Sequence, residues 1–183
     1  MSDEIIVKQC SPTLAGIKTG NIFLTDYETK EELVKDLRSI NNRLSHKGVR
    51  VIPVYFNGNK VLIYVYRPVS LEKDLKNQEA YSLLCEMGYK CSTTEQYLAK
   101  LIFNYKETRK IPHEIGLFLG YPPIDVRGFI ENKAQNYKSV GTWKVYGDEE
   151  EAKKTFRKYK LCSASYYNQW SKGQSIERLT VVA

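Results

Sequence analysis

Two side chains of the chain, those of Cys10 and His113, are of the types that thiol chemistry requires. Cys10 stands directly before Ser11-Pro12, a pair typical of a helix start. A cysteine just outside a helix N-terminus is favoured as the thiolate by the positive end of the helix dipole. His113 would act as base or orienting partner if it came within about 3 Å of the sulfur. The pair predicts a reactive thiol site, and a cysteine packed as a small hydrophobe is the alternative.

The residues that follow Cys10, GIKTGN (16–21), are a second candidate for chemistry. A nucleotide-binding P-loop has glycine directly before its lysine, whereas Ile17 precedes Lys18 here, so the spacing argues against that motif. Lys18, Thr19 and Asn21 are nevertheless expected to offer polar or anion contacts. A plain glycine turn is the alternative.

The segment IPHEIGLFLGYPP (111–123) carries His113 together with Glu114 and Tyr121. The prolines and Gly120 predict two short helices here. We expect Glu114 and Tyr121 to contact a ligand in a pocket where this segment meets the loop at 10–21. The ligand classes that these residues suit are small anions and flat aromatic molecules.

The cysteine pattern does not predict a metal site. Among the four cysteines, the closest pair, Cys85 and Cys91, encloses five residues, which matches none of the usual zinc spacings. Only two histidines are present. In a cytosolic protein all four thiols would be reduced.

The elements that would position these residues can be read from periodicity and caps. Apolar residues from Leu33 to Leu44 recur on one helical face after the N-cap candidate Thr29, and Gly48 is suited to follow the last turn. Two β-rich runs flank Asn57-Gly58, which predicts a hairpin, with Pro53 placing the first strand at an edge or a bulge.

The second half of the chain is mainly helical. Thr93 and Gln96 form a predicted capping box, and a long helix follows Asp148 and runs to Gly173. A short strand is expected around Trp143, and residues 175–183 are compatible with a final strand. The class is therefore α+β: a small sheet, formed by the central hairpin and short C-terminal strands, covered by about six or seven helices. We expect a single globular domain over 1–183.

Charge and hydropathy limit the classes of partner. The net charge of +7 attracts anions weakly, but the basic residues are spread along the chain, so a nucleic-acid footprint is not expected. The N-terminus lacks a signal-peptide core, and the longest apolar run, VLIYVY (61–66), is too short to span a bilayer. These patterns predict a cytoplasmic protein without membrane contact.

Three separated blocks carry a family resemblance. They are CSPTLAGIKTGNIF (10–23), IPHEIGLFLGYPPIDVRGFIENK (111–133), and GTWKVYGD (141–148) with the KYKLC and GQSIERLTV segments after it. Over essentially the whole chain the sequence resembles an uncharacterised family from anaerobic Gram-positive, clostridia-like bacteria, catalogued as a domain of unknown function. The resemblance implies no activity, but Cys10 and His113 fall in its characteristic blocks. The doubled Pro122-Pro123 departs from the family pattern.

Three functional hypotheses follow from the sequence. The first is a small-ligand-binding or redox-linked accessory protein with a site at Cys10 and His113. The second is a thiol-dependent enzyme of acyl or sulfur transfer, in which Cys10 is the nucleophile. The third is a nucleic-acid- or protein-binding module that uses the basic, tyrosine-rich surface.

Overall fold

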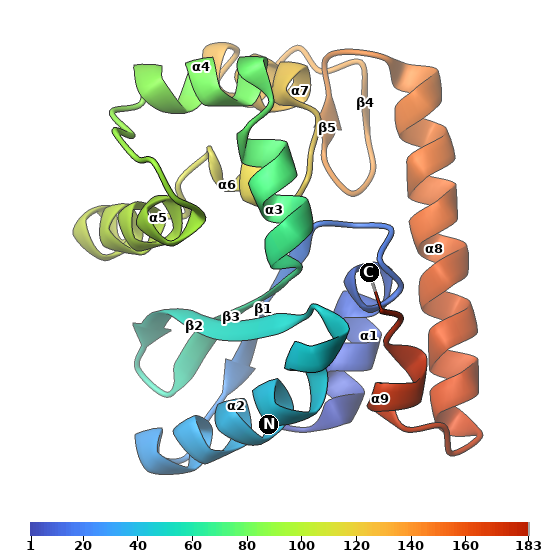
Figure 1. The fold of residues 1–183 in the computed structure, drawn as a ribbon. Helices are drawn as coiled ribbons and strands as arrows, with labels where there is room; N and C mark the ends of the chain where they lie inside the picture. Colours follow the sequence, from blue (N-terminus) through green and yellow to red (C-terminus); the bar gives the residue numbers. More distant parts are fainter. Residues whose placement is uncertain (183) are drawn as a thin grey trace. The chain divides into compact units, whose positions relative to one another are not determined.

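The structure is a computed structural model that describes residues 1–182, and the chain divides into two compact units. The first unit contains residues 1–69 and those from Tyr159 onward, and the second contains Ser70–Lys158. Residues 1–182 form nine α-helices, one three-stranded sheet and one two-stranded sheet, so the predicted α+β class is confirmed (Figure 1). The single globular domain expected from the sequence stays a prediction, and we describe each unit by itself.

The elements of the first unit come from both ends of the chain. In order they are α1 (Asp3–Leu14), β1 (Gly20–Asp26), α2 (Lys30–Leu44), a 3-10 turn (Ser45–Lys47), β2 (Arg50–Asn57), β3 (Lys60–Tyr66), the last part of α8 (Glu149–Ser171) and α9 (Ile176–Leu179). The antiparallel strand order is β1-β3-β2. Helices α1 and α2 share one apolar core with the inward side chains Val61, Ile63 and Val65 of β3.

The predicted hairpin is confirmed at the expected residues. Gly58 has a φ of 58°, and the β2–β3 register shifts between Pro53 and Tyr55. Strand β2 lies at an edge of the sheet. Proline is tolerated in an edge strand because one side of the strand has no neighbour to which a backbone N–H would have to donate. The central position of β3 explains why its residues from Val61 to Tyr66 are buried on both faces.

Three features differ from the sequence expectation. Gly20 and Asn21, expected as the end of a loop over 10–21, begin strand β1 because Gly20–Asp26 pairs with the whole of β3 from Tyr66 to Lys60. The expected final strand is wrong in the described residues, because Ser175 caps helix α9 instead. The strand at Trp143 does not join the hairpin, since β4 (Ser139–Val140) and β5 (Lys144–Val145) form a separate sheet.

Arg67 is a buried residue whose hydrogen bonds connect three segments of the first unit. It is 2% exposed, and its guanidinium donates to the carbonyls of Thr13 (2.7 Å), Leu14 (2.7 Å), Val181 (2.8 Å) and Lys47 (3.2 Å). Two of these acceptors, the carbonyls of Thr13 and Leu14, end α1, where carbonyls lack the usual donor four residues further along the helix; they also accept from the N–H groups of Gly16 and Val181, both at 3.1 Å. One buried cation therefore joins the end of α1, the 3-10 turn and the C-terminal segment.

The second unit is helical apart from one short hairpin. Its elements are α3 (Pro68–Leu75, which begins at the boundary), α4 (Gln78–Glu86), α5 (Thr94–Thr108), α6 (Ile115–Phe118), α7 (Pro123–Glu131), β4, β5 and the first part of α8. The capping box of Thr93 and Gln96 is confirmed at the start of α5. Asp148 accepts from the backbone N–H of Glu151 at 3.0 Å, as expected for the start of α8.

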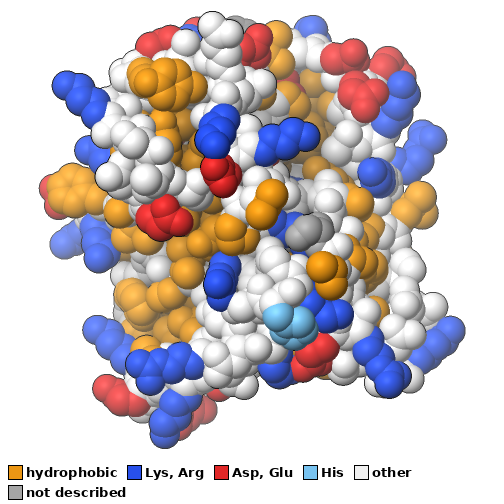
Figure 2. Space-filling view, in the orientation of Figure 1, with side chains coloured by type: hydrophobic (Ala, Val, Ile, Leu, Met, Phe, Trp, Pro, Cys, Tyr) orange, Lys and Arg blue, Asp and Glu red, His pale blue; other side chains and the backbone are white. Residues whose placement is uncertain are grey.

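The surface carries both signs of charge. Figure 2 shows Lys and Arg side chains spread over the visible face with Asp and Glu among them. Along α8, Lys153 pairs with Glu149 at 2.9 Å and Lys154 pairs with Glu151 at 3.4 Å. The acids thus offset part of the positive charge locally. Within residues 1–182, no helix has the length and apolar character needed to cross a membrane.

Candidate ligand-binding pocket

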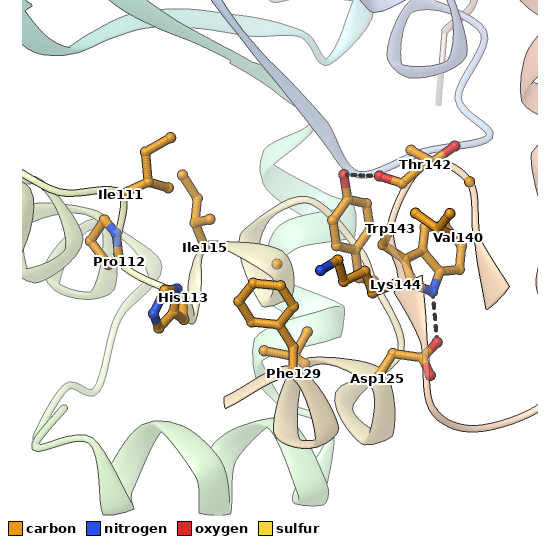
Figure 3. A pocket seen from close by; sticks show the side chains of 14 residues that line it. Ile111, Pro112, His113, Ile115, Asp125, Phe129, Val140, Thr142, Trp143 and Lys144 are labelled. Carbon is orange, nitrogen blue, oxygen red and sulfur yellow. Dashed lines mark hydrogen bonds between the residues drawn. The ribbon is translucent and has the colours of Figure 1, made fainter. Parts of the chain in front are cut away.

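A pocket of about 500 Å³ lies in the second unit, between α6, α7 and the β4–β5 hairpin (Figure 3). This volume falls in the range of about 300–1,000 Å³ that is typical of small-molecule sites. The lining is mainly apolar and aromatic, with four polar or charged side chains besides Tyr121 and Trp143, namely those of His113, Asp125, Thr142 and Lys144.

Close helix packing forms the floor of the pocket. A Cβ at Gly116 of α6 would stand 2.7 Å from Val126 of α7 and 3.2 Å from the Tyr121 ring. The absence of a side chain therefore lets α6 approach α7 closely. Helix α7 starts at Pro123. Proline suits the first turn because the backbone N–H groups there have no acceptor within the helix, so the N–H that proline lacks is not required.

A buried carboxylate fixes the hairpin against α7. Asp125 accepts from the indole N–H of Trp143 at 2.7 Å and from the backbone N–H groups of Tyr146 and Gly147, both at 2.7 Å. Both carboxylate oxygens are thereby engaged, and the indole plane is held in one orientation. Asp125 is thus a positioning residue for the aromatic wall.

The aromatic wall consists of Trp143 and its neighbours. The Trp143 ring lies 4.8 Å from that of Tyr121 and 4.5 Å from that of Phe156 on α8. The hydroxyl of Tyr121 donates to the carbonyl of Thr142 at 3.3 Å. A rigid surface of this kind can contact a flat apolar molecule without losing much side-chain entropy on binding.

The mouth of the pocket leaves apolar side chains in contact with solvent. Ile111 is 49% exposed and Val140 is 62% exposed. His113 packs its ring edge-on against Phe129, with 5.2 Å between the ring centroids. An imidazole at an apolar mouth can donate or accept a hydrogen bond from an entering molecule.

Lys144 brings a positive charge to the same pocket from β5. Its ammonium donates to the carbonyl of Ala134 at 2.8 Å and lies 4.6 Å from the Tyr137 ring centroid and 6.0 Å from that of Phe129. Figure 3 shows the ammonium directed toward Phe129, in the space between the hairpin and α7.

Glu114 lies beside His113 in the sequence but does not line this pocket. Its buried carboxylate accepts from the hydroxyl of Tyr89 at 2.8 Å and from the amide of Asn104 at 3.3 Å. Burial, and then the Glu114 charge, raise the pKa of Tyr89. Glu114 therefore joins the 111–123 segment to α5 and to the segment that follows α4, and a contact with ligand stays a prediction.

Cys10 lies in the closed core of the first unit. Helix α1 begins after the N-cap Ser2, so the expected start at Ser11-Pro12 is wrong and Cys10 is eight positions beyond that cap. The side chain is 0% exposed, and burial raises the pKa of the thiol, an effect that the nearby Lys18 charge opposes. This environment keeps the thiol neutral, which is the opposite of thiolate activation.

The three polar candidates that follow Cys10 also belong to the first unit. Lys18 is 5% exposed, and burial lowers its pKa to about 8, although Cys10 acts in the opposite direction. Its ammonium lies 5.8 Å from the centroid of the Tyr159 ring. Thr19 is buried as well, and Asn21 accepts from the hydroxyl of Thr13 at 2.8 Å.

The structure thus brings together some of the predicted site residues. His113 and Tyr121 line one pocket, and Cys10 lies near Lys18 in the other unit. Pairing of Cys10 with His113 stays a prediction. Sequence reasoning missed Asp125, Phe129 and Lys144, although Trp143 and Lys144 stand in the GTWKVYGD block.

Comparison with known proteins adds a family but no activity. Among residues 1–182, no group of three or more His, Cys, Asp and Glu side chains is arranged to hold a metal ion. A family model described as "Protein of unknown function (DUF3793)" matches residues 6–180. No curated protein and no solved structure gives a significant match to the chain.

Proposed function

The chain belongs to this family of unknown function, and we propose, from the geometry of its pocket, a function in ligand binding. The ligand would be a small, flat, largely apolar molecule held between α6, α7 and the β4–β5 hairpin. The observation that carries the proposal is an aromatic wall whose orientation is fixed by Asp125. An enzyme activity is not needed to explain this arrangement.

Two further observations support ligand binding. Exposed apolar side chains at the opening of a mainly apolar hollow are typical of ligand sites. Ile111 and Val140 are exposed in this way. The few polar groups among the lining residues, such as His113, would then fix the orientation of the bound molecule.

The proposal differs in one respect from the site expected from the sequence. It retains His113 and Tyr121 as ligand contacts, while Cys10 is not needed for binding. The buried, neutral thiol of Cys10 argues for a packing role, so a redox-linked function would need a separate demonstration.

Titration with N-phenyl-1-naphthylamine, an uncharged probe that fluoresces in apolar surroundings, tests the proposal. We expect saturable binding at one site. Phe129 lines the pocket and is half-buried, so Phe129→Ala should fold and weaken binding about tenfold, as expected for the loss of one aromatic contact.

Phe103→Ala is the matched control, because Phe103 is an exposed phenylalanine on α5 that is not among the lining residues. This variant should bind the probe like the unmodified protein. Unsaturable fluorescence, or equal weakening by both substitutions, would contradict a ligand site in this pocket.

A further inference from the structure

Resting on this proposed function, we propose that the ligand of the pocket is an aromatic carboxylate, whose anionic group pairs with the ammonium of Lys144. The proposal assigns Lys144 as the residue that discriminates between acids and their uncharged analogues. It depends on four properties of the pocket: the balance of charge among its lining residues, the way Lys144 is held, the backbone turn that holds it, and the aromatic side chains of the lining.

The charged groups of the lining favour an anion. Asp125 and Lys144 are the charged residues among those that line the pocket, with His113 as a third titratable group. The carboxylate of Asp125 is buried and receives three N–H groups from Trp143, Tyr146 and Gly147. Because its charge is already compensated by the protein, Asp125 does not favour a cationic ligand.

Lys144 is held in a way that leaves it able to bind an anion. An ammonium has three N–H donors, and one of them is directed to the carbonyl of Ala134. The ammonium also lies over the rings of Tyr137 and Phe129, which attract a cation but do not neutralise it. A carboxylate would add the negative partner that Ala134 and the two rings do not provide.

The turn that supplies the Ala134 carbonyl has an unfavourable backbone. Lys133, Ala134 and Asn136 have φ angles of 49°, 63° and 58°, a left-handed region that residues with a Cβ adopt rarely. The turn folds back on α7, where the N–H of Ala134 donates to the carbonyl of Phe129 at 2.9 Å. Together with the bond from the Lys133 N–H to the Ile130 carbonyl at 3.2 Å, this pattern is a common way to end a helix, and here the same turn provides the carbonyl to which Lys144 donates.

The rest of the lining specifies the body of the ligand. Trp143, Tyr121 and Phe129 provide aromatic faces and edges, against which a planar ring system packs well. A bicyclic aromatic ring is small enough for a volume of about 500 Å³. An aromatic carboxylate combines a planar body with one anionic group of a size that a single ammonium can pair with, and therefore satisfies both requirements.

Isothermal titration with naphthalene-2-carboxylate and the uncharged naphthalene-2-carboxamide tests the proposal. We expect the carboxylate to bind about tenfold more tightly, since a hydrogen bond between two charged groups is stronger than one between neutral groups. Lys144→Gln should abolish this preference, so that the ratio of the two affinities falls to about one. Lys144→Arg retains the positive charge and should preserve the preference.

Lys138→Gln is the matched control. Lys138 precedes the same hairpin and also donates to a backbone carbonyl, that of Gly147 at 2.6 Å, but it is not among the lining residues. The Lys138→Gln variant should keep the full preference for the carboxylate. Equal loss in both lysine variants would mean that only the general surface charge attracts the anion, which would overturn the assignment of Lys144.

The two compounds also separate this inference from the proposed function. If both bind the unmodified protein equally well, the carboxylate inference is wrong while the apolar pocket stands as a binding site. If neither binds, and the uncharged fluorescent probe also fails, the proposed function is wrong and the inference fails with it.

Discussion

The surroundings of Cys10 in the first unit and of Trp143 in the second unit differ in access and in the state of their polar groups. Cys10 is 0% exposed, and burial keeps its thiol neutral. Around Trp143, a fixed carboxylate orients an aromatic wall beside a pocket with apolar side chains at its mouth. The residue types around Cys10 favoured the first region as the site of chemistry. The solvent access of the pocket and the fixed orientation of its aromatic side chains favour the second region as the site of binding.

The largest expected effect is on the pocket wall. Trp143→Ala removes the indole from between Tyr121 and Phe156 and leaves Asp125 without one of its three donors. We expect a loss of about 4 kcal/mol in the free energy of unfolding, measured by urea denaturation. Trp143→Phe retains a ring and should lose less. If Trp143→Ala unfolds at the same urea concentration as the unmodified protein, the wall is not a fixed structure.

The corresponding test of the first unit is Arg67→Met. This change removes the guanidinium that donates to four backbone carbonyls, of which those of Thr13 and Leu14 keep a second donor, the N–H groups of Gly16 and Val181. We expect a loss of about 3 kcal/mol in the free energy of unfolding, because several hydrogen bonds from one charged donor are lost together. Arg50→Met, which removes an exposed arginine, is the control and should change the stability little. Equal effects of the two changes would contradict the connecting role of Arg67.

Thiol labelling compares access directly. Cys85 is exposed and Cys10 is buried, so iodoacetamide should modify Cys85 at least about 100-fold faster, a ratio equivalent to about 2.7 kcal/mol. Mass spectrometry of the peptides gives both rates in one sample, and in guanidinium chloride the two rates should become similar. Rapid labelling of Cys10 in the native protein would restore it as a reactive-site candidate.

The smallest effect concerns Lys18, whose pKa burial lowers to about 8 from an ordinary value of 10.5. Below pH 8 the folded state must bury a charged ammonium, so Lys18→Met should be more stable than the unmodified protein by on the order of 2 kcal/mol. The unfolded state binds the proton more tightly than the folded state does. The advantage of Lys18→Met should therefore shrink as the pH rises from 8 to 10.5.

Urea denaturation at several pH values measures this difference. Lys35→Met, at an exposed position of α2, is the control and should show no comparable pH dependence. If the difference between Lys18→Met and the unmodified protein is independent of pH, the ammonium of Lys18 is not buried at a cost to stability.

Local signals predicted the elements that depend on neighbouring residues in the chain. Thr29 caps α2, Gln96 completes the capping box of α5, and Gly58 turns the hairpin, as expected from the sequence. Ser11-Pro12 misled because an earlier cap at Ser2 starts α1 and the helix continues through Pro12. A residue suited to an N-cap marks a helix start only where the chain is not already helical because of an earlier cap.

The candidate pocket could be predicted only in part. His113 and Tyr121 were found because they stand in one short segment with helix-start signals. Asp125 could not be assigned, because its partner Trp143 is 18 positions away and no periodicity connects the two. The position of the Lys144 ammonium depends on its hydrogen bond to the carbonyl of Ala134, which has a left-handed backbone. Sequence patterns predict that conformation at glycine or asparagine and not at alanine.

The guanidinium of Arg67 has a consequence for biosynthesis. Its acceptors include the carbonyl of Val181, close to the end of the chain, as well as those of Thr13 and Leu14, close to the beginning. Residues 70–158 are an insertion within the first unit. The core that contains helix α1 therefore cannot be completed until Val181 has been synthesised, and the inserted segment is fully synthesised before the unit that surrounds it in sequence.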